Sequence, residues 1–168
     1  HQIMLTIEKK SLRVGRYVDT KHVDTVVRNY KQERWVYNSE RLGKEDSLSS
    51  WYSVEELEDF LAHIKQYGAD GVRIYYGVYP HDFAERPEYA GRQTVVLVAT
   101  KRKHSEVGYH ADKDIYIDGE NGAQILAYNM STQCPPTCPG NNPGGPDPDF
   151  GGIGITLVDR GDEGLTVV

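Results

Sequence analysis

The sequence has few of the residues that build disulfide-stapled or membrane-spanning proteins. Its 168 residues include only two cysteines, whereas small secreted scaffolds carry several disulfides. No apolar run approaches the roughly 20 residues that cross a bilayer, so we expect no membrane span. A chain of this length usually forms one domain, and it buries enough surface to fold without a metal or a disulfide.

Positive charge is scarce outside the first part of the chain, and the formal net charge is −6. Residues 1–50 carry ten Lys and Arg against seven Asp and Glu, whereas residues 51–168 carry nine against eighteen. Nucleic acids and anionic membrane surfaces attract basic proteins. The acidic body of the chain therefore predicts that it has no nucleic-acid partner.

The N-terminal residues leave the cellular location open. The chain begins with His1, and Met4 follows three residues later. Either residues 1–3 were added before a natural start at Met4, or His1 is the first residue of a processed chain. No basic segment followed by an apolar stretch marks a signal peptide. We expect a cytoplasmic protein, with a processed, exported chain as the alternative.

A first helix is predicted over residues 20–34. Its apolar residues recur at intervals of three and four, which places them on one side of a helix, and Asp19 or Thr20 can cap it. These apolar residues are Val23, Val26, Val27 and Tyr30. Residues 38–46 are polar and charged and are predicted to form a loop.

A second helix follows Ser53, and its start is the clearest local signal in the chain. Ser53 and Glu56 have the spacing of a capping box, in which each side chain binds the other residue's backbone amide. Gly68 supplies the left-handed residue that ends such a helix. The predicted buried stripe comprises Val54, Leu57, Phe60, Leu61 and Ile64.

Strands are predicted on both sides of this helix. Alternating or wholly apolar runs mark them, and residues 118–122 have the composition of a hairpin turn. The predicted strands comprise residues 47–52, 71–79 and 94–100 and the hairpin over residues 115–128. We therefore expect a single α+β domain with a small, mostly antiparallel sheet packed by two helices.

The composition changes near residue 133, which divides the chain into a domain over residues 1–132 and a tail over residues 133–168. The tail holds six of the eight prolines and eight of the seventeen glycines. Its first half is unsuited to regular structure, while residues 153–158 and 165–168 are predicted to form two short strands. These strands can pair with the edge of a sheet, in the same chain or in another copy.

The two cysteines, Cys134 and Cys138, lie in the tail and are separated by Pro-Pro-Thr. Each residue before a proline favours an extended conformation, which would hold the two sulfurs apart. Free thiols, a disulfide and a metal site all remain open. A metal site would need further ligands, such as His104 and His110 from the predicted loop over residues 104–112. No cofactor is expected.

No catalytic motif is present in the sequence. Nucleophilic catalysis needs a serine or cysteine beside an oriented base, and neither a nucleophile elbow nor a metalloprotease helix occurs. The chain has six histidines, but His104 and His110 are most simply solvated. A small enzyme or metal-binding protein that uses the two cysteines remains the alternative hypothesis.

One face of the strand over residues 71–79 is predicted to bind a protein. Arg73, Tyr75 and Tyr79 share this face, and Val72, Ile74, Tyr76 and Val78 share the other. Tyr, Trp and Arg are enriched at binding hot spots, so Trp51 is a further candidate. His81 is another, because it follows Pro80 at the end of this strand. The alternative is that the helix over residues 20–34 covers this face.

The chain resembles a group of short bacterial proteins with no assigned activity. The resemblance rests on residues 51–57, 68–77, 95–98 and 134–138 and covers about residues 20–139. It implies no ligand and no catalytic residue. We therefore expect a non-catalytic module that binds a protein or other copies of itself, with assembly through the C-terminal tail as one route.

Overall fold

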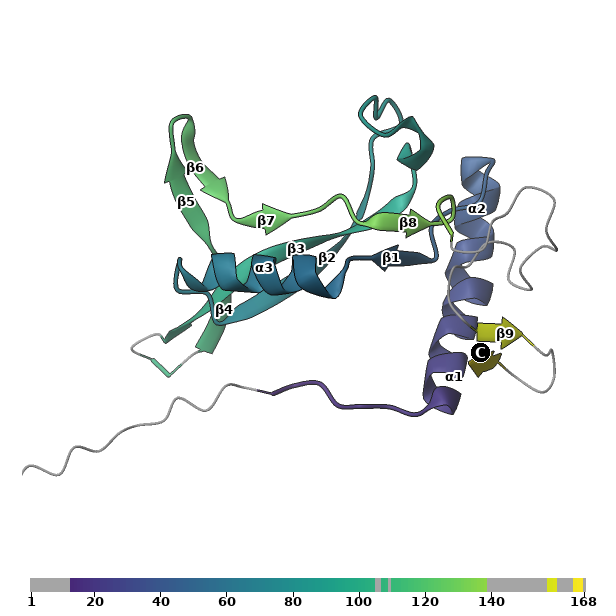
Figure 1. Ribbon diagram of the computed structural model, residues 1–168, viewed down its shortest axis with the longest axis horizontal. Coiled ribbons are helices and arrows are strands. Elements are labelled where there is room, and N and C mark those ends of the chain that lie inside the picture. Colours follow the sequence, from purple (N-terminus) through teal and green to yellow (C-terminus); the bar gives the residue numbers. More distant parts are fainter. Residues whose placement is uncertain (1–12, 105–106, 109, 139–156, 160–164, 168) are drawn as a thin grey trace, which may run out of the picture.

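The computed structural model describes residues 13–104, 107–108 and 110–138, and two short strands over residues 157–159 and 165–167. It has the predicted mixture of helices and antiparallel sheets (Figure 1). Among these described residues, no helix has both the length and the apolar character to cross a membrane.

The first helix is longer than predicted. It runs through α1 (Thr20–Tyr30), a π-helical turn (Lys31–Trp35) and α2 (Val36–Leu42), and ends at Gly43, whose φ is 75°. The predicted cap is confirmed, because Asp19 accepts from the His22 amide at 2.8 Å. The loop predicted over residues 38–46 is wrong in its first half.

Contacts with the following chain explain why the helix continues. The Trp35 indole donates to the Asp46 carbonyl at 2.7 Å, and the Asp46 amide donates to Ser39 Oγ at 2.9 Å. These bonds hold α2 against the chain that leads to the sheet. A local polarity pattern contains no information about such tertiary contacts, and no residue of α1 or α2 is fully buried.

The second helix, α3 (Val54–Lys65), forms as predicted. Ser53 Oγ accepts from the Glu56 amide at 3.1 Å, and the Glu56 carboxylate accepts from the Ser53 amide at 3.2 Å. Of the predicted buried stripe, only Phe60 and Ile64 are fully buried, whereas Val54 and Leu61 are exposed. Gly68 has the predicted positive φ, 83°.

The main sheet is antiparallel, with the order β2-β3-β4 and with β7 beside β3. Its strands are β2 (Gly71–Val78), β3 (Gln93–His104), β4 (His110–Asp114) and β7 (Ala127–Tyr128). The predicted loop over residues 104–112 is instead partly strand, since His104 and His110 face each other across β3 and β4. The Arg102 guanidinium pairs with the Asp112 carboxylate beside them at 3.1 Å.

The remaining strands form two-stranded sheets. The strand predicted over residues 47–52 is present as β1 (Ser49–Trp51), but it pairs with β8 (Thr132–Cys134) and not with the central strands. The predicted hairpin is confirmed as β5 (Tyr116–Gly119) and β6 (Gly122–Ile125). In the tail, β9 (Leu157–Asp159) and β10 (Leu165–Val167) pair with each other, and β10 lies against α1. Residues 139–156 lie outside the described residues.

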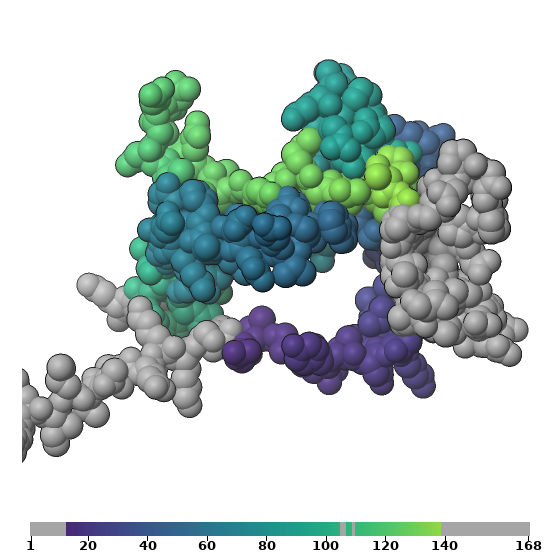
Figure 2. All heavy atoms as spheres, in the orientation of Figure 1, coloured from purple at the N-terminus to yellow at the C-terminus, as the bar shows by residue number. Residues whose placement is uncertain are grey.

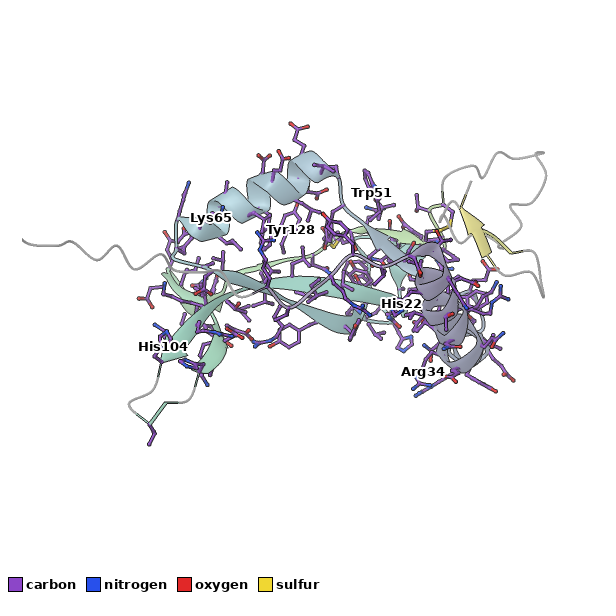
Figure 3. All side chains as sticks on the ribbon, turned by 90° about the horizontal axis from the view of Figure 1, so that it is seen from below. His22, Arg34, Trp51, Lys65, His104 and Tyr128 are labelled. Carbon is purple, nitrogen blue, oxygen red and sulfur yellow. A yellow bond between two sulfur atoms is a disulfide. The ribbon has the colours of Figure 1, made fainter. Side chains whose placement is uncertain are left out.

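The core lies between α3 and β3. Phe60 and Ile64 from the helix meet Leu97 and Ala99 from the strand, together with Leu126. The Phe60 ring stacks on Tyr128 of β7 with their centroids 5.2 Å apart. Figure 3 shows Tyr128 between α3 and the sheet. The helix therefore covers the β3 and β7 side of one sheet face.

Candidate functional site

β2 is an edge strand whose outer side is open. The Tyr79 amide, directly after β2, donates to the Arg92 carbonyl at 3.0 Å. The Ala99 amide of β3 donates to Leu126 at 3.0 Å, away from β2. Because backbone groups alternate in direction along an antiparallel strand, residues 72, 74, 76 and 78 direct their amides and carbonyls outward. No strand among the described residues pairs with them.

The same four residues carry exposed apolar side chains on one face of the sheet. Val72 is 36% exposed, Ile74 56%, Tyr76 84% and Val78 65%. Their partners across the strand pair are Ala99, Leu97, Val95 and Gln93. Leu97 and Ala99 lie under α3, whereas the β2 residues lie beyond it. The apolar face of the sheet is thus covered over β3 and uncovered over β2.

A groove of about 470 Å³ lies where this uncovered face meets β1 and α3. Its lining includes Tyr30, Ser49, Leu57, Ile74, Tyr76 and Val95. In Figure 2 an open gap separates α3 from the segment that leads into α1. Apolar walls with a few polar groups are typical of sites that bind another molecule.

The wall nearest α1 is held by a buried carboxylate. Asp46, only 4% exposed, accepts from the amides of Ser47 at 2.8 Å and Gln93 at 2.7 Å. The Tyr30 hydroxyl donates to the Gln93 side chain. Burial, together with the Asp46 carboxylate, raises the pKa of Tyr30. Tyr30 is therefore a neutral, positioned wall residue at physiological pH.

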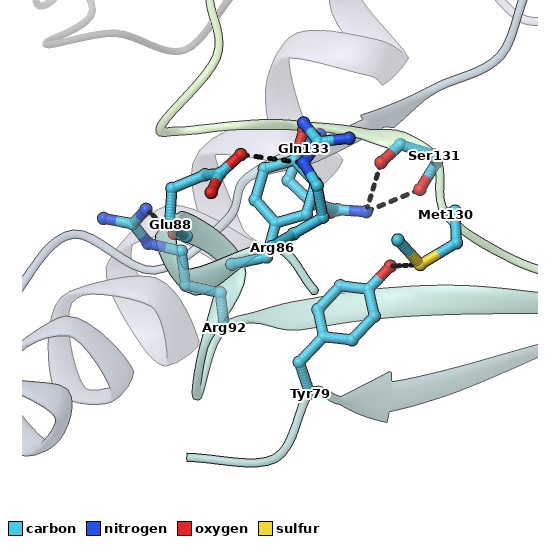
Figure 4. A network of polar contacts seen from close by, with 8 residues as sticks. Tyr79, Arg86, Glu88, Arg92, Met130, Ser131 and Gln133 are labelled. Carbon is cyan, nitrogen blue, oxygen red and sulfur yellow. Dashed lines mark hydrogen bonds and ion pairs between the residues drawn. The ribbon is translucent and has the colours of Figure 1, made fainter. Parts of the chain in front are cut away.

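A second polar network holds the chain beneath β8 (Figure 4). Tyr89 and Gln133 have no exposed surface, and the Gln133 amide donates to the Tyr89 hydroxyl at 3.3 Å. Arg86 donates to the same hydroxyl at 3.0 Å. The Gln133 side chain donates to Thr94 Oγ1 at 3.0 Å, which ties β8 to β3. Sequence reasoning missed Tyr89, which lies between the predicted strands over residues 71–79 and 94–100.

The binding residues predicted from the sequence are not gathered on one surface. Tyr79 is buried, stacks on Phe83 with a centroid distance of 4.6 Å and is unavailable to a partner. His81 is exposed and lies beside Gly91. Trp51 is exposed but belongs to the separate β1–β8 sheet.

Arg73 and Tyr75 do lie together, but another strand engages them. The Arg73 guanidinium forms an ion pair with the Asp114 carboxylate of β4 and donates to the Asp112 carbonyl at 2.8 Å. The Tyr75 hydroxyl donates to Asp114, and this bond raises the pKa of Tyr75. These contacts stabilise the pairing across the sheet and tie Arg73 and Tyr75 to β4.

The cysteines form a disulfide, with 4.8 Å between their Cα atoms. The intervening segment turns, because the Thr137 amide donates to the Gln133 carbonyl at 2.8 Å. The peptide bonds Cys134–Pro135 and Pro135–Pro136 are both cis. The expectation of an extended segment was wrong, since it considered each residue alone and not the turn.

This disulfide leaves neither Cys134 nor Cys138 as a thiolate that can bind a metal or attack a substrate. The histidines that were to complete such a site are also distant. His104 and His110 pack edge to face, with their ring centroids 4.5 Å apart. Figure 3 shows His104 at one end of the molecule and Trp51 toward the other. Trp51 pairs with β8, the strand that contains Cys134. Among the described residues, no three His, Cys, Asp or Glu are arranged to hold a metal.

Comparisons with known proteins do not assign this site. No family model, curated protein or solved structure matches the chain. The open edge must therefore be interpreted from its own chemistry. Sequence alternation had separated the two faces of β2 correctly, but it contained no signal for which face α3 leaves uncovered.

Proposed function

We propose that this chain is a non-catalytic module that associates with other copies of itself through the open edge of β2. The observation that carries the proposal is the coincidence of unpaired backbone groups and exposed apolar side chains on residues 72, 74, 76 and 78. Strand addition to such an edge is a known recognition mode. Long, apolar, uncovered edges otherwise promote uncontrolled aggregation.

Charge and exposure support a second copy as the partner. Residues 1–50 are net basic, whereas the rest of the chain is acidic. Three of its carboxylates, Glu55, Glu58 and Asp59, are exposed on α3. The chain also carries further exposed apolar residues before α1, namely Val14 and Tyr17, which are 90% and 104% exposed. One molecule thus offers both an acceptor surface and a complementary basic, apolar segment.

The test compares two full-length variants, each with one exposed tyrosine replaced by lysine. Tyr76→Lys places a charge on the open edge, and Tyr37→Lys places one on α2, where Tyr37 is 65% exposed. Sedimentation velocity over a concentration series should show association for the wild type and Tyr37→Lys but not for Tyr76→Lys. A wild type that stays monomeric at all concentrations would sink the proposal.

Assembly through the C-terminal tail remains a prediction. In the described part of the tail, β9 and β10 pair only with each other. The β2 edge is supported more directly, because its unpaired groups are described. The absence of a nucleic-acid partner likewise remains a prediction from the acidic charge.

For the cellular location, we propose an oxidising compartment. The Cys134–Cys138 disulfide favours the processed, exported alternative over the predicted cytoplasmic location, because reduced thiols prevail in the cytosol. Cells would be quenched in acid and their free thiols alkylated, and the mass of the chain would then show how many of its two cysteines carry the alkyl label. An unlabelled chain supports export, and a doubly labelled chain would overturn it.

A further inference from the structure

The open edge of β2 has a specific candidate occupant within the sequence. Residues 3–7 read Ile-Met-Leu-Thr-Ile and lie outside the described residues. Ile3, Leu5 and Ile7 alternate, so a strand formed by them presents three branched apolar side chains on one face. This is the pattern needed to cover Ile74 and Tyr76 while the backbone pairs with β2.

We infer that residues 3–7 of one copy add as a strand to β2 of the next copy, an inference that rests on the proposed function. The donor then lays Ile3, Leu5 and Ile7 into the groove beside Leu57. Each copy contributes a donor at its N-terminus and an acceptor at β2, so the contact is head-to-tail. Such a contact builds a ring if it closes and a filament if it does not.

The segment between donor and helix fits this arrangement. Residues 8–19 can span roughly 40 Å when extended, which is enough to reach a neighbouring molecule. Val14 and Tyr17 within it are almost fully exposed, so they are not packed on their own sheet. In Figure 1 its described part, residues 13–19, runs past the sheet into α1.

Charge reinforces the placement of the donor. Lys9, Lys10, Arg13 and Arg16 follow the donor residues. The exposed acidic residues Glu55, Glu58 and Asp59 lie on α3 of the acceptor, the helix whose Leu57 lines the groove. Complementary charges at the rim of an interface steer association and fix its orientation.

The first experiment uses matched variants of the full chain. Leu5→Asp puts a charge on the apolar face of the donor, and Thr6→Asp puts the same charge on its other face. Leu5→Asp should weaken association by more than about 100-fold, because it buries an unpaired charge. Thr6→Asp should change it by less than about threefold. Equal losses in the two variants would show a general charge effect and overturn the inference.

The second experiment mixes broken donors with broken acceptors. Leu5→Asp retains an acceptor edge, and Tyr76→Lys retains a donor strand. Mixing the two should form a one-to-one complex that grows no further, which sedimentation velocity and native mass spectrometry detect. The matched control mixes Tyr76→Lys with a double variant carrying Leu5→Asp and Tyr76→Lys, which has no acceptor and should form no complex.

The outcomes separate this inference from the proposed function. If Leu5→Asp associates like the wild type while Tyr76→Lys does not, β2 edges pair directly with each other. The proposed function then stands and the donor assignment fails. If the wild type is monomeric and the Leu5→Asp substitution only destabilises it, the segment docks on its own chain, and both proposals fail.

Discussion

The two halves of one sheet face carry the same residue pattern and have opposite surroundings. Leu97 of β3 and Ile74 of β2 lie opposite each other in the strand pair. Leu97 is 6% exposed under α3, and Ile74 is 56% exposed beyond it. The amphipathic pattern therefore determines which face is apolar, while the position of α3 determines which part of that face stabilises the monomer. The other part stays exposed.

The covered half is stabilised by more than apolar contact. Phe60 stacks on Tyr128, and the Tyr128 hydroxyl donates to the Glu56 carboxylate, so a polar bond closes the edge of the core. Among the described residues nothing closes the uncovered half in this way, since the backbone groups of β2 face outward there. A second chain that pairs with β2 would supply both the apolar cover and the hydrogen bonds.

The largest expected effect comes from truncating the two opposed residues. Leu97→Ala should lower the free energy of unfolding by about 2–5 kcal/mol, because it leaves a cavity under α3. Ile74→Ala should lower it by less than about 1 kcal/mol, since much of that side chain already contacts water. Urea denaturation of both variants measures the difference. Equal losses would mean that the two halves are equally covered.

A second test concerns β8, which pairs with the β1 wall of the groove. Replacing both cysteines, Cys134→Ser with Cys138→Ser, should lower the free energy of unfolding by about 2 kcal/mol, as expected for a short closed loop. Association should persist, because the β2 edge does not include the disulfide. Reduction of the wild type is the control. If the double variant stops associating, then association depends on the part of the groove that the disulfide holds and not on the open edge of β2 alone.

A third test titrates the bond that closes the covered half. The hydrogen bond to Glu56 raises the pKa of Tyr128 to about 12. A raised tyrosine pKa means that folding favours the neutral phenol. The contribution is therefore present below pH 10 and is lost as the pH rises from 10 to 12. The stability difference between the wild type and Tyr128→Phe should shrink over that range.

Glu56→Gln separates the two roles of that side chain. Glutamine can still close the capping box with Ser53, but it removes the negative charge beside Tyr128. Absorbance titration near 295 nm should then show the pKa of Tyr128 returning toward 10, with a stability loss of about 0.5–1.5 kcal/mol. An unchanged titration curve would show that the hydrogen bond is not what holds the phenol neutral.

The elements that sequence reasoning predicted well are those with local causes. The start of α3 follows from two residues three apart, and the faces of β2 follow from alternation. The errors have causes distant in the sequence. Helix α2 persists because Asp46 binds Trp35 and Ser39, and β1 pairs with β8, more than 80 residues later. No spacing rule within a segment contains these contacts.

The candidate site shows the same division. The sequence made β2 the candidate binding strand, but it favoured the face with Arg73 and Tyr75 because those residue types are common at interfaces. Asp114 engages both of them from β4. Only the three-dimensional placement of α3 reveals that the apolar side chains on the other face are the uncovered ones.

The smallest expected effect decides whether the open half serves a partner. Tyr76→Lys should change the free energy of unfolding of the monomer by less than about 0.5 kcal/mol, because the ring is 84% exposed. The same substitution should abolish association. Urea denaturation at a concentration where the wild type is monomeric gives the first value, and sedimentation gives the second. A loss of several kcal/mol in the free energy of unfolding would instead mean that Tyr76 packs in the core of the monomer. The two halves of the sheet face would then be covered alike.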